Sequence, residues 1–152
     1  MKRYVFRLEA VLKVRKIKEE NCRMELGELI AQLNRIEDQL SHERKEIASY
    51  FTIQEDSLKN GMKAGLLQAF PMLVAAKDKN IELLLRDRAE QEKRIEQKKQ
   101  ELAVLRGELK VIENLREKDY LEYRKALNKE IDQKVEEQTQ NWLQHQDKKG
   151  LL

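Results

Sequence analysis

The sequence predicts an all-α protein, a long antiparallel hairpin of two helices that pack as a coiled coil. Of its 152 residues, 39% are charged and 40% are apolar, with one proline and five glycines. This composition is typical of long coiled-coil helices. Two long stretches also place apolar residues at alternating steps of three and four. Such spacing keeps one seam turned towards one partner helix.

The first predicted helix covers about residues 3–60. Its stripe begins at Leu8 and ends at Tyr50. Within the stripe, every position from Cys22 to Leu40 is apolar. A single narrow stripe must be buried against another element. The stripe positions are Leu8, Leu12, Arg15, Glu19, Cys22, Leu26, Leu29, Leu33, Ile36, Leu40, Glu43, Ile47 and Tyr50.

The second predicted helix covers about residues 70–145 and follows a turn at about residues 61–69. Its stripe keeps the same steps from Ile81 to Ile112 and then continues with adjacent steps of four, which locally unwind a supercoil. Two glycines four residues apart, of which Gly61 is the first, favour a helix end and a turn. Each helix would therefore bury its stripe against the other.

The position of the turn predicts which residues face each other. With the turn centred near residue 66, the numbers of facing residues add to roughly 131. Glu43 would then lie level with Arg88. The segment from Lys129 to Leu152 would have no partner inside the chain. We therefore expect a single coiled-coil domain, residues 1–152, with an unpaired C-terminal extension.

The sequence contains no group of residues that would support catalysis. Catalytic groups need a desolvated pocket, whereas a two-helix hairpin offers a solvated surface. The chain has no glycine-rich phosphate loop and no C-x-x-C motif, and one cysteine with two histidines disfavours a zinc site. We therefore predict a protein that is not an enzyme and that holds no metal and no cofactor.

Charge is concentrated at the start of the chain. The first 18 residues contain seven basic residues and one acidic residue, a net charge of +6. A basic amphipathic start fits an anionic membrane, a nucleic acid or an acidic protein surface. The basic residues are too sparse for a basic-zipper DNA binder, so we expect no nucleic-acid partner. The sequence has no transmembrane stretch and no apolar signal core, and it predicts a cytosolic protein.

Both ends of the predicted hairpin carry apolar residues beyond those that the seam requires. Ile131, Val135 and Trp142 continue past the end of the first helix, and Phe51 and Phe70 lie near the turn. Exposed apolar surface often marks an interaction site. The alternatives are a frayed C-terminus at one end and a simple hydrophobic cap of the hairpin at the other.

Four segments, in order along nearly the whole chain, form a recognisable pattern. They are Tyr4-Val5-Phe6-Arg7-Leu8-Glu9-Ala10-Val11-Leu12-Lys13; Gly61-Met62 with Ala64-Gly65-Leu66; Phe70, Leu73-Val74, Lys77 and Ile81; and Ile112-Glu113-Asn114-Leu115-Arg116-Glu117-Lys118 followed by Tyr123-Arg124 and Glu130-Ile131-Asp132. Together these segments resemble the flagellar type III export protein FliJ family.

This resemblance implies a non-enzymatic component of the bacterial flagellar protein export apparatus, which serves flagellum assembly, motility and chemotaxis. Members of the family form a two-helix coiled coil similar to the gamma stalk of rotary ATPases. They insert the end that carries both termini into the hexameric export ATPase and promote its assembly and activity. They also contact the cytoplasmic domain of the membrane export gate and handle export chaperones. The protein would then lie in the cytoplasm at the flagellar base, associated with the inner membrane through its partners.

The resemblance also implies two binding surfaces on this chain. The ATPase-binding end would comprise Phe6, Arg7, Leu8, Leu12, Arg116, Tyr120, Tyr123 and Arg124. The export-gate-binding surface would comprise Gln39, Glu43, Tyr50, Leu73 and Leu84. Two alternative functions stay open, namely the equivalent stalk of a virulence type III secretion system and a general structural coiled coil.

Overall fold

The computed structural model describes residues 2–61 and 63–150, and for residues 64 and 66 it describes the backbone alone. Met62, which belongs to the predicted turn, lies outside the described residues, as do Met1, Leu151 and Leu152 at the ends of the predicted domain. The helices are α1 (Glu9–Lys59), α2 (Ala64–Leu67) and α3 (Ala69–Gly150). The described residues contain no strand, and the predicted all-α helical hairpin is confirmed.

At the turn the long helices end and begin within one residue of the predicted positions, whereas their other two ends differ from the prediction. α1 begins at Glu9 rather than near residue 3, because the first residues run as a non-helical segment whose Phe6 carbonyl accepts a hydrogen bond from the Glu9 N–H at 3.3 Å. An acidic residue at this position suits the positive end of the helix dipole. α3 begins at Ala69 and continues to Gly150, past the predicted end near residue 145. Pro71 lies in its first turn, where a missing N–H costs no helical hydrogen bond.

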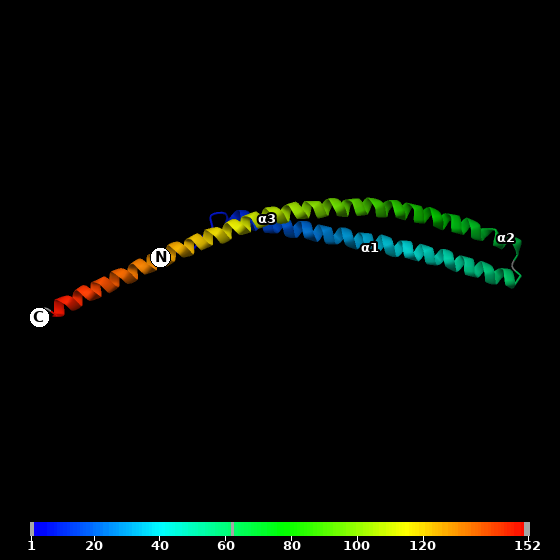
Figure 1. The fold of residues 1–152 in the computed structure, drawn as a ribbon. Coiled ribbons are helices and arrows are strands. Elements are labelled where there is room, and N and C mark those ends of the chain that lie inside the picture. Colours follow the sequence, from blue (N-terminus) through cyan, green and yellow to red (C-terminus); the bar gives the residue numbers. More distant parts are fainter. Residues whose placement is uncertain (1, 62, 151–152) are drawn as a thin grey trace. The chain divides into compact units, whose positions relative to one another are not determined.

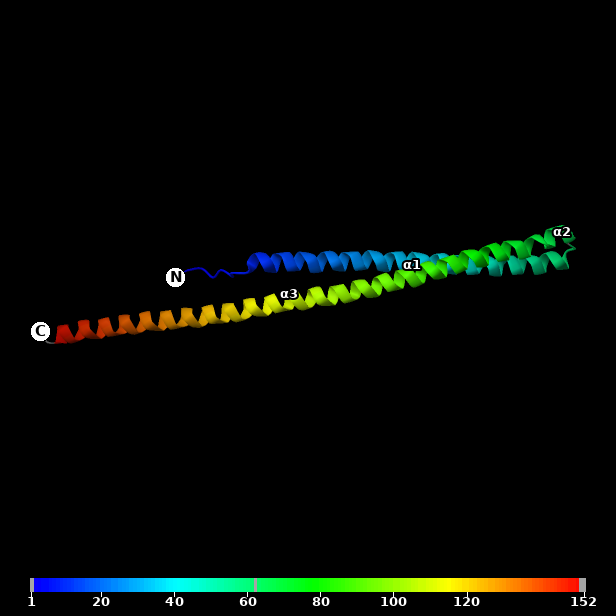
Figure 2. The ribbon, with the colours of Figure 1, turned by 90° about the horizontal axis from the view of Figure 1, so that it is seen from above.

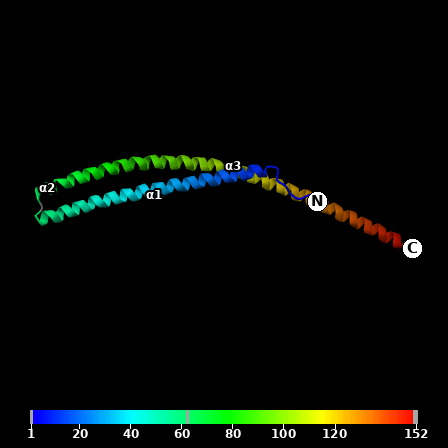
Figure 3. The same cartoon turned by 180° about the vertical axis from the view of Figure 1, so that it is seen from behind.

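The chain divides into two compact units. Unit 1 comprises Met1–Glu19 and Leu105–Leu152, and unit 2 comprises Glu20–Val104. In unit 2, the light-blue and cyan part of α1 runs beside the green part of α3, and α2 lies next to the turn that joins them (Figures 1 and 3). Unit 2 is therefore itself an antiparallel helical hairpin.

Burial in unit 2 follows the predicted stripe. Every predicted seam position of α1 from Cys22 to Tyr50 is buried or half-buried, as is every predicted position of α3 from Ile81 to Leu102. The most deeply buried of these are Leu40, which is 2% exposed, and Cys22, which is 3% exposed. The heptad spacing thus identifies the contact face of both helices.

The register of the hairpin differs from the predicted one. Lys98 forms an ion pair with Glu25 at 2.7 Å, and Lys77 forms one with Glu46. In both pairs the residue numbers add to 123, whereas a turn centred near residue 66 required about 131. The chain therefore reverses about four residues earlier than predicted.

The early reversal follows from the conformation of Gly61. This residue has a φ of 80°, a left-handed conformation that glycine adopts without strain and that commonly ends a helix. The second glycine, Gly65, lies inside α2 and does not form the reversal. Glu43 consequently meets Lys77, and the predicted level position of Glu43 and Arg88 is wrong.

The role of Gly61 in the turn can be tested by making the same substitution at two glycines. Gly61→Ala should lower the free energy of unfolding by about 1–2 kcal/mol, because alanine is strained at positive φ. Gly107→Ala should raise it by about 1 kcal/mol, because Gly107 lies inside α3 and a Cβ there meets no atom within 4 Å. Urea denaturation followed by circular dichroism measures both values. Equal effects of the two substitutions would contradict the assigned turn.

In unit 1, α3 continues beyond its last contact with the N-terminal segment. The Tyr123 hydroxyl donates a hydrogen bond to the Lys2 carbonyl at 2.7 Å, and every described residue from 128 to 150 is exposed. The orange and red part of α3 has no second helix beside it (Figures 1 and 2). Its exposed apolar side chains include Ile131, Val135 and Trp142. Residues 128–150 form the C-terminal extension of α3.

Candidate protein-interaction surfaces

A small apolar core holds unit 1 together. Phe6, Leu12 and Ile112 are 7%, 1% and 5% exposed and form one cluster, against which Tyr4 and Leu109 pack. Phe6 comes from the non-helical segment, so this cluster fastens the start of the chain to α3. A core of this size is sensitive to any loss of side-chain volume.

Three of the four tyrosines contact one another, and one of them, Tyr4, also packs against this core. The Tyr4 ring lies edge-on to Tyr120 with centroids 5.1 Å apart, and it is tilted against Tyr123 at 5.2 Å. The Tyr4 hydroxyl donates a hydrogen bond to the Asp119 carboxylate at 3.1 Å. Aromatic pairs at such distances add to the stabilisation from burial alone. The N-terminal segment is therefore held along α3 by rings as well as by the apolar core.

Charged side chains on the surface of unit 1 also link α1 to α3. Arg15 donates a hydrogen bond to the Glu108 carbonyl at 2.8 Å, and Arg106 pairs with Glu19 at 3.2 Å. Arg15 and Glu19 are two of the polar positions in the predicted α1 stripe. Each long side chain keeps its charged group at the edge of the seam and covers apolar atoms with its stem. Polar residues at these positions are thus compatible with the helical contact.

The predicted ATPase-binding residues all lie in unit 1 but divide into two groups. Phe6 and Leu12 are buried in the core, and Tyr123 is half-buried. The side chains accessible to a partner are Arg7, Leu8, Arg116, Tyr120 and Arg124. Leu8 is 38% exposed, so the buried stripe of α1 begins at Leu12 instead of at Leu8. Of the predicted set, only the exposed residues could contact a partner directly.

Sequence reasoning did not assign a role to Tyr4. Its environment raises the pKa of the Tyr4 hydroxyl above the ordinary value, through desolvation and through the hydrogen bond to Asp119. The only sequence signal was the position of three tyrosines at the two ends of the chain, which an antiparallel hairpin brings together. The spacing of these tyrosines shows that they contact one another only once the register of the hairpin is known.

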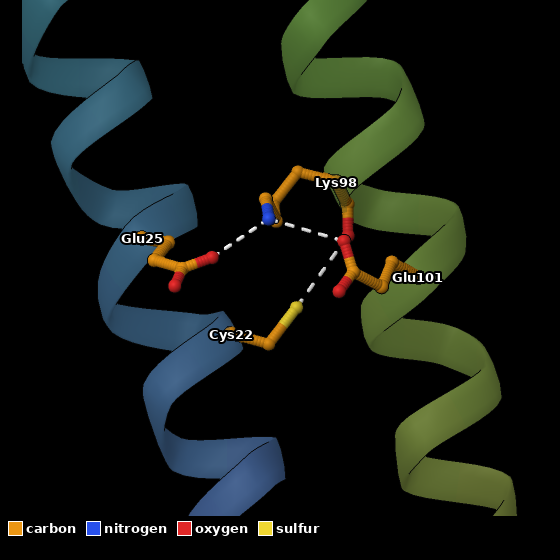
Figure 4. A network of polar contacts seen from close by, with 4 residues as sticks. All are labelled: Cys22, Glu25, Lys98 and Glu101. Carbon is orange, nitrogen blue, oxygen red and sulfur yellow. Dashed lines mark hydrogen bonds and ion pairs between the residues drawn. The ribbon is translucent and has the colours of Figure 1, made fainter.

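In unit 2, a polar network crosses the seam at the level of Cys22. Lys98 pairs with Glu25 of α1 at 2.7 Å and with Glu101 of its own helix at 3.0 Å, as Figure 4 shows. The Cys22 sulfur lies 3.9 Å from the Lys98 carbonyl oxygen. The hydrogen bonds that the Lys98 ammonium group donates to the two glutamates raise the pKa of Lys98. This lysine occupies a predicted seam position and is accommodated because its ammonium group reaches both carboxylates.

Gln91 is the one buried polar side chain among the described residues, at 4% exposure. Its Nε2 donates hydrogen bonds to the Leu29 carbonyl and to Gln32 Oε1, both at 3.0 Å. A buried amide without partners would be costly, so these two bonds tie Gln91 to one level of α1. Single buried polar residues of this kind specify register in coiled coils.

The predicted export-gate surface has a charged cluster at its centre. Lys77 of α3 contacts Glu43 at 3.1 Å and also pairs with Glu46, which in turn lies 2.9 Å from His42. The hydrogen bond from Lys77 is the main cause that lowers the pKa of Glu46, and the bonds to Glu46 and Glu43 raise the pKa of Lys77. Glu43 is half-buried, as its predicted place in the stripe requires, but its basic partner is Lys77 and not Arg88.

The other predicted gate residues flank this cluster along unit 2. Gln39 and Leu73 are exposed, whereas Tyr50 and Leu84 are half-buried in the seam. In the observed register, in which facing numbers add to 123, Gln39 lies level with Leu84 and Tyr50 lies level with Leu73. The set therefore occupies one continuous stretch of the hairpin.

The ion pairs of Lys77 predict a pH dependence of stability. The folded-state pKa of Glu46 lies below 4.5, so its contribution is present above pH 4.5 and is lost as the pH falls through the folded value. The folded-state pKa of Lys77 lies above 10.5, so its contribution is present below that pH and is lost in stronger alkali. Melting temperatures from pH 7 to pH 3 should fall less steeply for Glu46→Gln than for the unsubstituted chain. Glu96→Gln, an exposed glutamate, is the matched control, and equal slopes for all three proteins would contradict the role of Glu46.

The fold places this chain in a general class of proteins. The described residues contain no group of three side chains suited to a metal ion and no helix apolar enough to cross a membrane. Two long helices make up most of the described chain and pack against each other. The class is therefore that of a coiled-coil protein.

Comparison with known proteins narrows this class. The family model described as "Flagellar FliJ protein" matches residues 4–135. Because the match covers most of the chain, the protein belongs to the FliJ family, a family of coiled-coil proteins related to flagellar export. Searches of curated proteins and of solved structures give no match.

Proposed function

We propose that this protein is the coiled-coil stalk of the flagellar type III export ATPase. Unit 1 enters the hexameric ATPase and promotes its assembly and activity. Unit 2 contacts the cytoplasmic domain of the membrane export gate, and the protein also engages export chaperones. It acts in the cytoplasm at the flagellar base and is not an enzyme. Family membership over residues 4–135 is the observation that carries this proposal.

The make-up of unit 1 supports the ATPase-binding role. The first 18 residues carry a net charge of +6, and the exposed side chains of Arg7, Arg116 and Arg124 lie in the same unit. Leu8 and Tyr120, which are 38% and 42% exposed, add apolar area to this basic surface. Arginine and aromatic side chains are enriched among the residues that dominate protein interfaces. A partner with acidic and apolar groups is therefore complementary to this end.

Unit 2 supports a second, separate contact. Leu73 is 45% exposed, and Gln39 exposes its amide on the same stretch of the hairpin. The Lys77 cluster fixes the level of α3 against α1 there, so the two helices present these residues in a defined arrangement. This stretch is the surface that we assign to the export gate.

Surface substitutions in unit 1 test the ATPase-binding role without removing its core. Leu8→Asp and Arg124→Glu should each weaken binding to the export ATPase of the same organism by about tenfold, since a central interface residue typically contributes more than 1 kcal/mol. Val111→Asp and Lys110→Glu are matched controls, because both residues are exposed in unit 1 and lie outside the proposed surface. Binding measured by surface plasmon resonance should be unchanged in these controls.

A loss of binding in all four variants would indicate general damage and would contradict the assigned surface, as would unchanged binding in all four. Circular dichroism should show native helicity in each variant. The alternative function, a stalk of a virulence secretion system, predicts activity with that system's ATPase instead. The family match favours the flagellar assignment.

A further inference from the structure

An open groove on unit 2 lies on the side of the seam opposite to the proposed gate surface. Its lining from α1 includes Leu40, Ser41, Arg44, Lys45 and Ala48, and its lining from α3 is Arg88. Leu40, which is 2% exposed, also belongs to the hairpin core. The groove therefore has small residues along α1 and basic residues at its edges, above a Leu40 side chain that the helix pair already covers.

The helical repeat separates this groove from the gate surface. Successive residues of an α-helix are about 100° apart, so residues two positions apart point to nearly opposite sides. Ser41 and Glu43 are related in this way, as are Ala48 and Tyr50. The acidic Glu43 and Glu46 thus lie on one flank of α1, where Lys77 engages them, while the groove lies on the other flank.

The basic groups of the groove are not engaged within the chain. In the described part of the protein, Arg44 and Lys45 form no ion pair, and the nearest carboxylate of Arg88 is that of Glu92 on its own helix, at 3.9 Å. That distance is too long for a hydrogen bond. One acidic residue, Glu37, lines the groove against three basic residues. The guanidinium groups of Arg44 and Arg88 thus retain their capacity for paired hydrogen bonds to carboxylates.

The small side chains of the groove determine how closely a partner helix can approach. Ser41 and Ala48 lie seven residues apart, two turns of α1, so that a third helix can approach the helix pair closely between them. An amphipathic helix would place its apolar face on Ala48 and on the aliphatic stems of Arg44 and Lys45, with its acidic flank beside the charged groups of Arg44, Lys45 and Arg88. Charge complementarity therefore selects an acidic helix over a neutral or a basic one.

We propose that this groove is a docking site for an acidic amphipathic helix of a partner protein. The site goes beyond the proposed function, because it uses residues of neither the ATPase-binding end nor the gate surface. It gives unit 2 two independent contact faces, one on each side of the seam. A helix bound here would leave Glu43 and Lys77 accessible to another partner.

A defined peptide tests the proposal. The probe is a stapled, fluorescein-labelled helix with leucine at its seam positions and glutamate at its flanking positions. The control peptide has glutamine in place of each glutamate. We expect the acidic peptide to bind the full chain with an affinity that falls as salt rises, and at least about tenfold more tightly than the glutamine peptide, as measured by fluorescence anisotropy.

Two matched pairs of variants locate the site. Arg44→Glu combined with Lys45→Glu should weaken binding of the acidic peptide by about tenfold or more, whereas Lys93→Glu with Arg94→Glu, an exposed adjacent pair in unit 2, should not. Ala48→Trp should block the groove without changing charge, whereas Ala31→Trp, at an exposed position elsewhere on α1, should not.

Equal binding of the acidic and glutamine peptides would overturn the proposal, as would unchanged binding to the Arg44, Lys45 and Ala48 variants. Circular dichroism of each variant separates loss of the groove from loss of the fold. If the acidic peptide does not bind the groove, the proposed ATPase-binding role is unaffected, because that role is tested with residues of unit 1. Conversely, loss of ATPase binding in unit 1 variants would not affect peptide binding to unit 2.

Discussion

Leu12→Ala should destabilise unit 1 by about 2–4 kcal/mol. Leu12 is 1% exposed and belongs to the cluster that joins Phe6 of the N-terminal segment to Ile112 of α3. Truncation leaves a cavity that few neighbouring side chains can fill, so the contact between α1 and α3 should loosen there. Hydrogen exchange should accelerate at residues 9–19 and 105–123 and remain slow in the middle of unit 2.

The matched control is Val14→Ala, two residues along the same helix. Val14 is 50% exposed, so the same kind of truncation there should change the free energy of unfolding by less than about 1 kcal/mol. If Leu12→Ala and Val14→Ala have equal effects on hydrogen exchange, the assigned core of unit 1 is wrong.

Replacement of Gln91 should give opposite effects with two different residues. Gln91→Leu should stabilise unit 2 by about 1 kcal/mol, because the seam gains an apolar contact and the two former acceptors keep other partners. The Leu29 carbonyl lies within α1, and Gln32 is exposed to water. Gln91→Ala removes both the hydrogen bonds and the packing and should destabilise by about 1–2 kcal/mol. Urea denaturation should rank the proteins leucine, glutamine, alanine in decreasing stability.

A different ranking would contradict the view that Gln91 is a polar residue that lowers the stability of an otherwise apolar seam. In particular, a leucine variant less stable than the natural chain would mean that its hydrogen bonds contribute more than apolar burial at that level. Gln97→Leu, an exposed position on α3, is the control and should change stability by less than about 0.5 kcal/mol.

The contact faces of both helices could be predicted from the sequence because burial follows a simple spacing. The predicted stripe positions from Leu12 to Tyr50 in α1 and from Ile81 to Ile112 in α3 are buried or half-buried, including polar ones such as Arg15 and Lys98. A 3.5-residue repeat determines the face of a helix independently of its partner. It also accommodates occasional polar side chains, provided that their charged groups reach the edge of the seam.

The register could not be predicted in this way, because a heptad seam looks the same after a shift of seven residues. What distinguishes one register from another is the pairing of polar side chains between the helices and the position of the turn. The Lys98–Glu25 and Lys77–Glu46 pairs select the observed level, and the positive φ of Gly61 places the reversal. Neither signal is visible from hydropathy alone.

The exposure of the candidate surface residues could be predicted only in part. Tyr120 and Arg124 are exposed as expected of binding residues, whereas Phe6 and Leu12 lie in a core that exists only because the N-terminal segment folds back on α3. The basic groove beside Arg44 escaped sequence reasoning entirely. Its residues come from two helices, and Arg88 reaches it through the register that the sequence did not specify.

The central claim is that this chain acts as the stalk of the export ATPase. The most direct test is to titrate the purified chain into the export ATPase of the same organism and to follow ATP hydrolysis and ring formation together. We expect stimulation that saturates near one chain per ATPase hexamer, with rings visible by electron microscopy. Absence of both binding and stimulation would contradict the stalk function and leave the protein a member of the family with a different role.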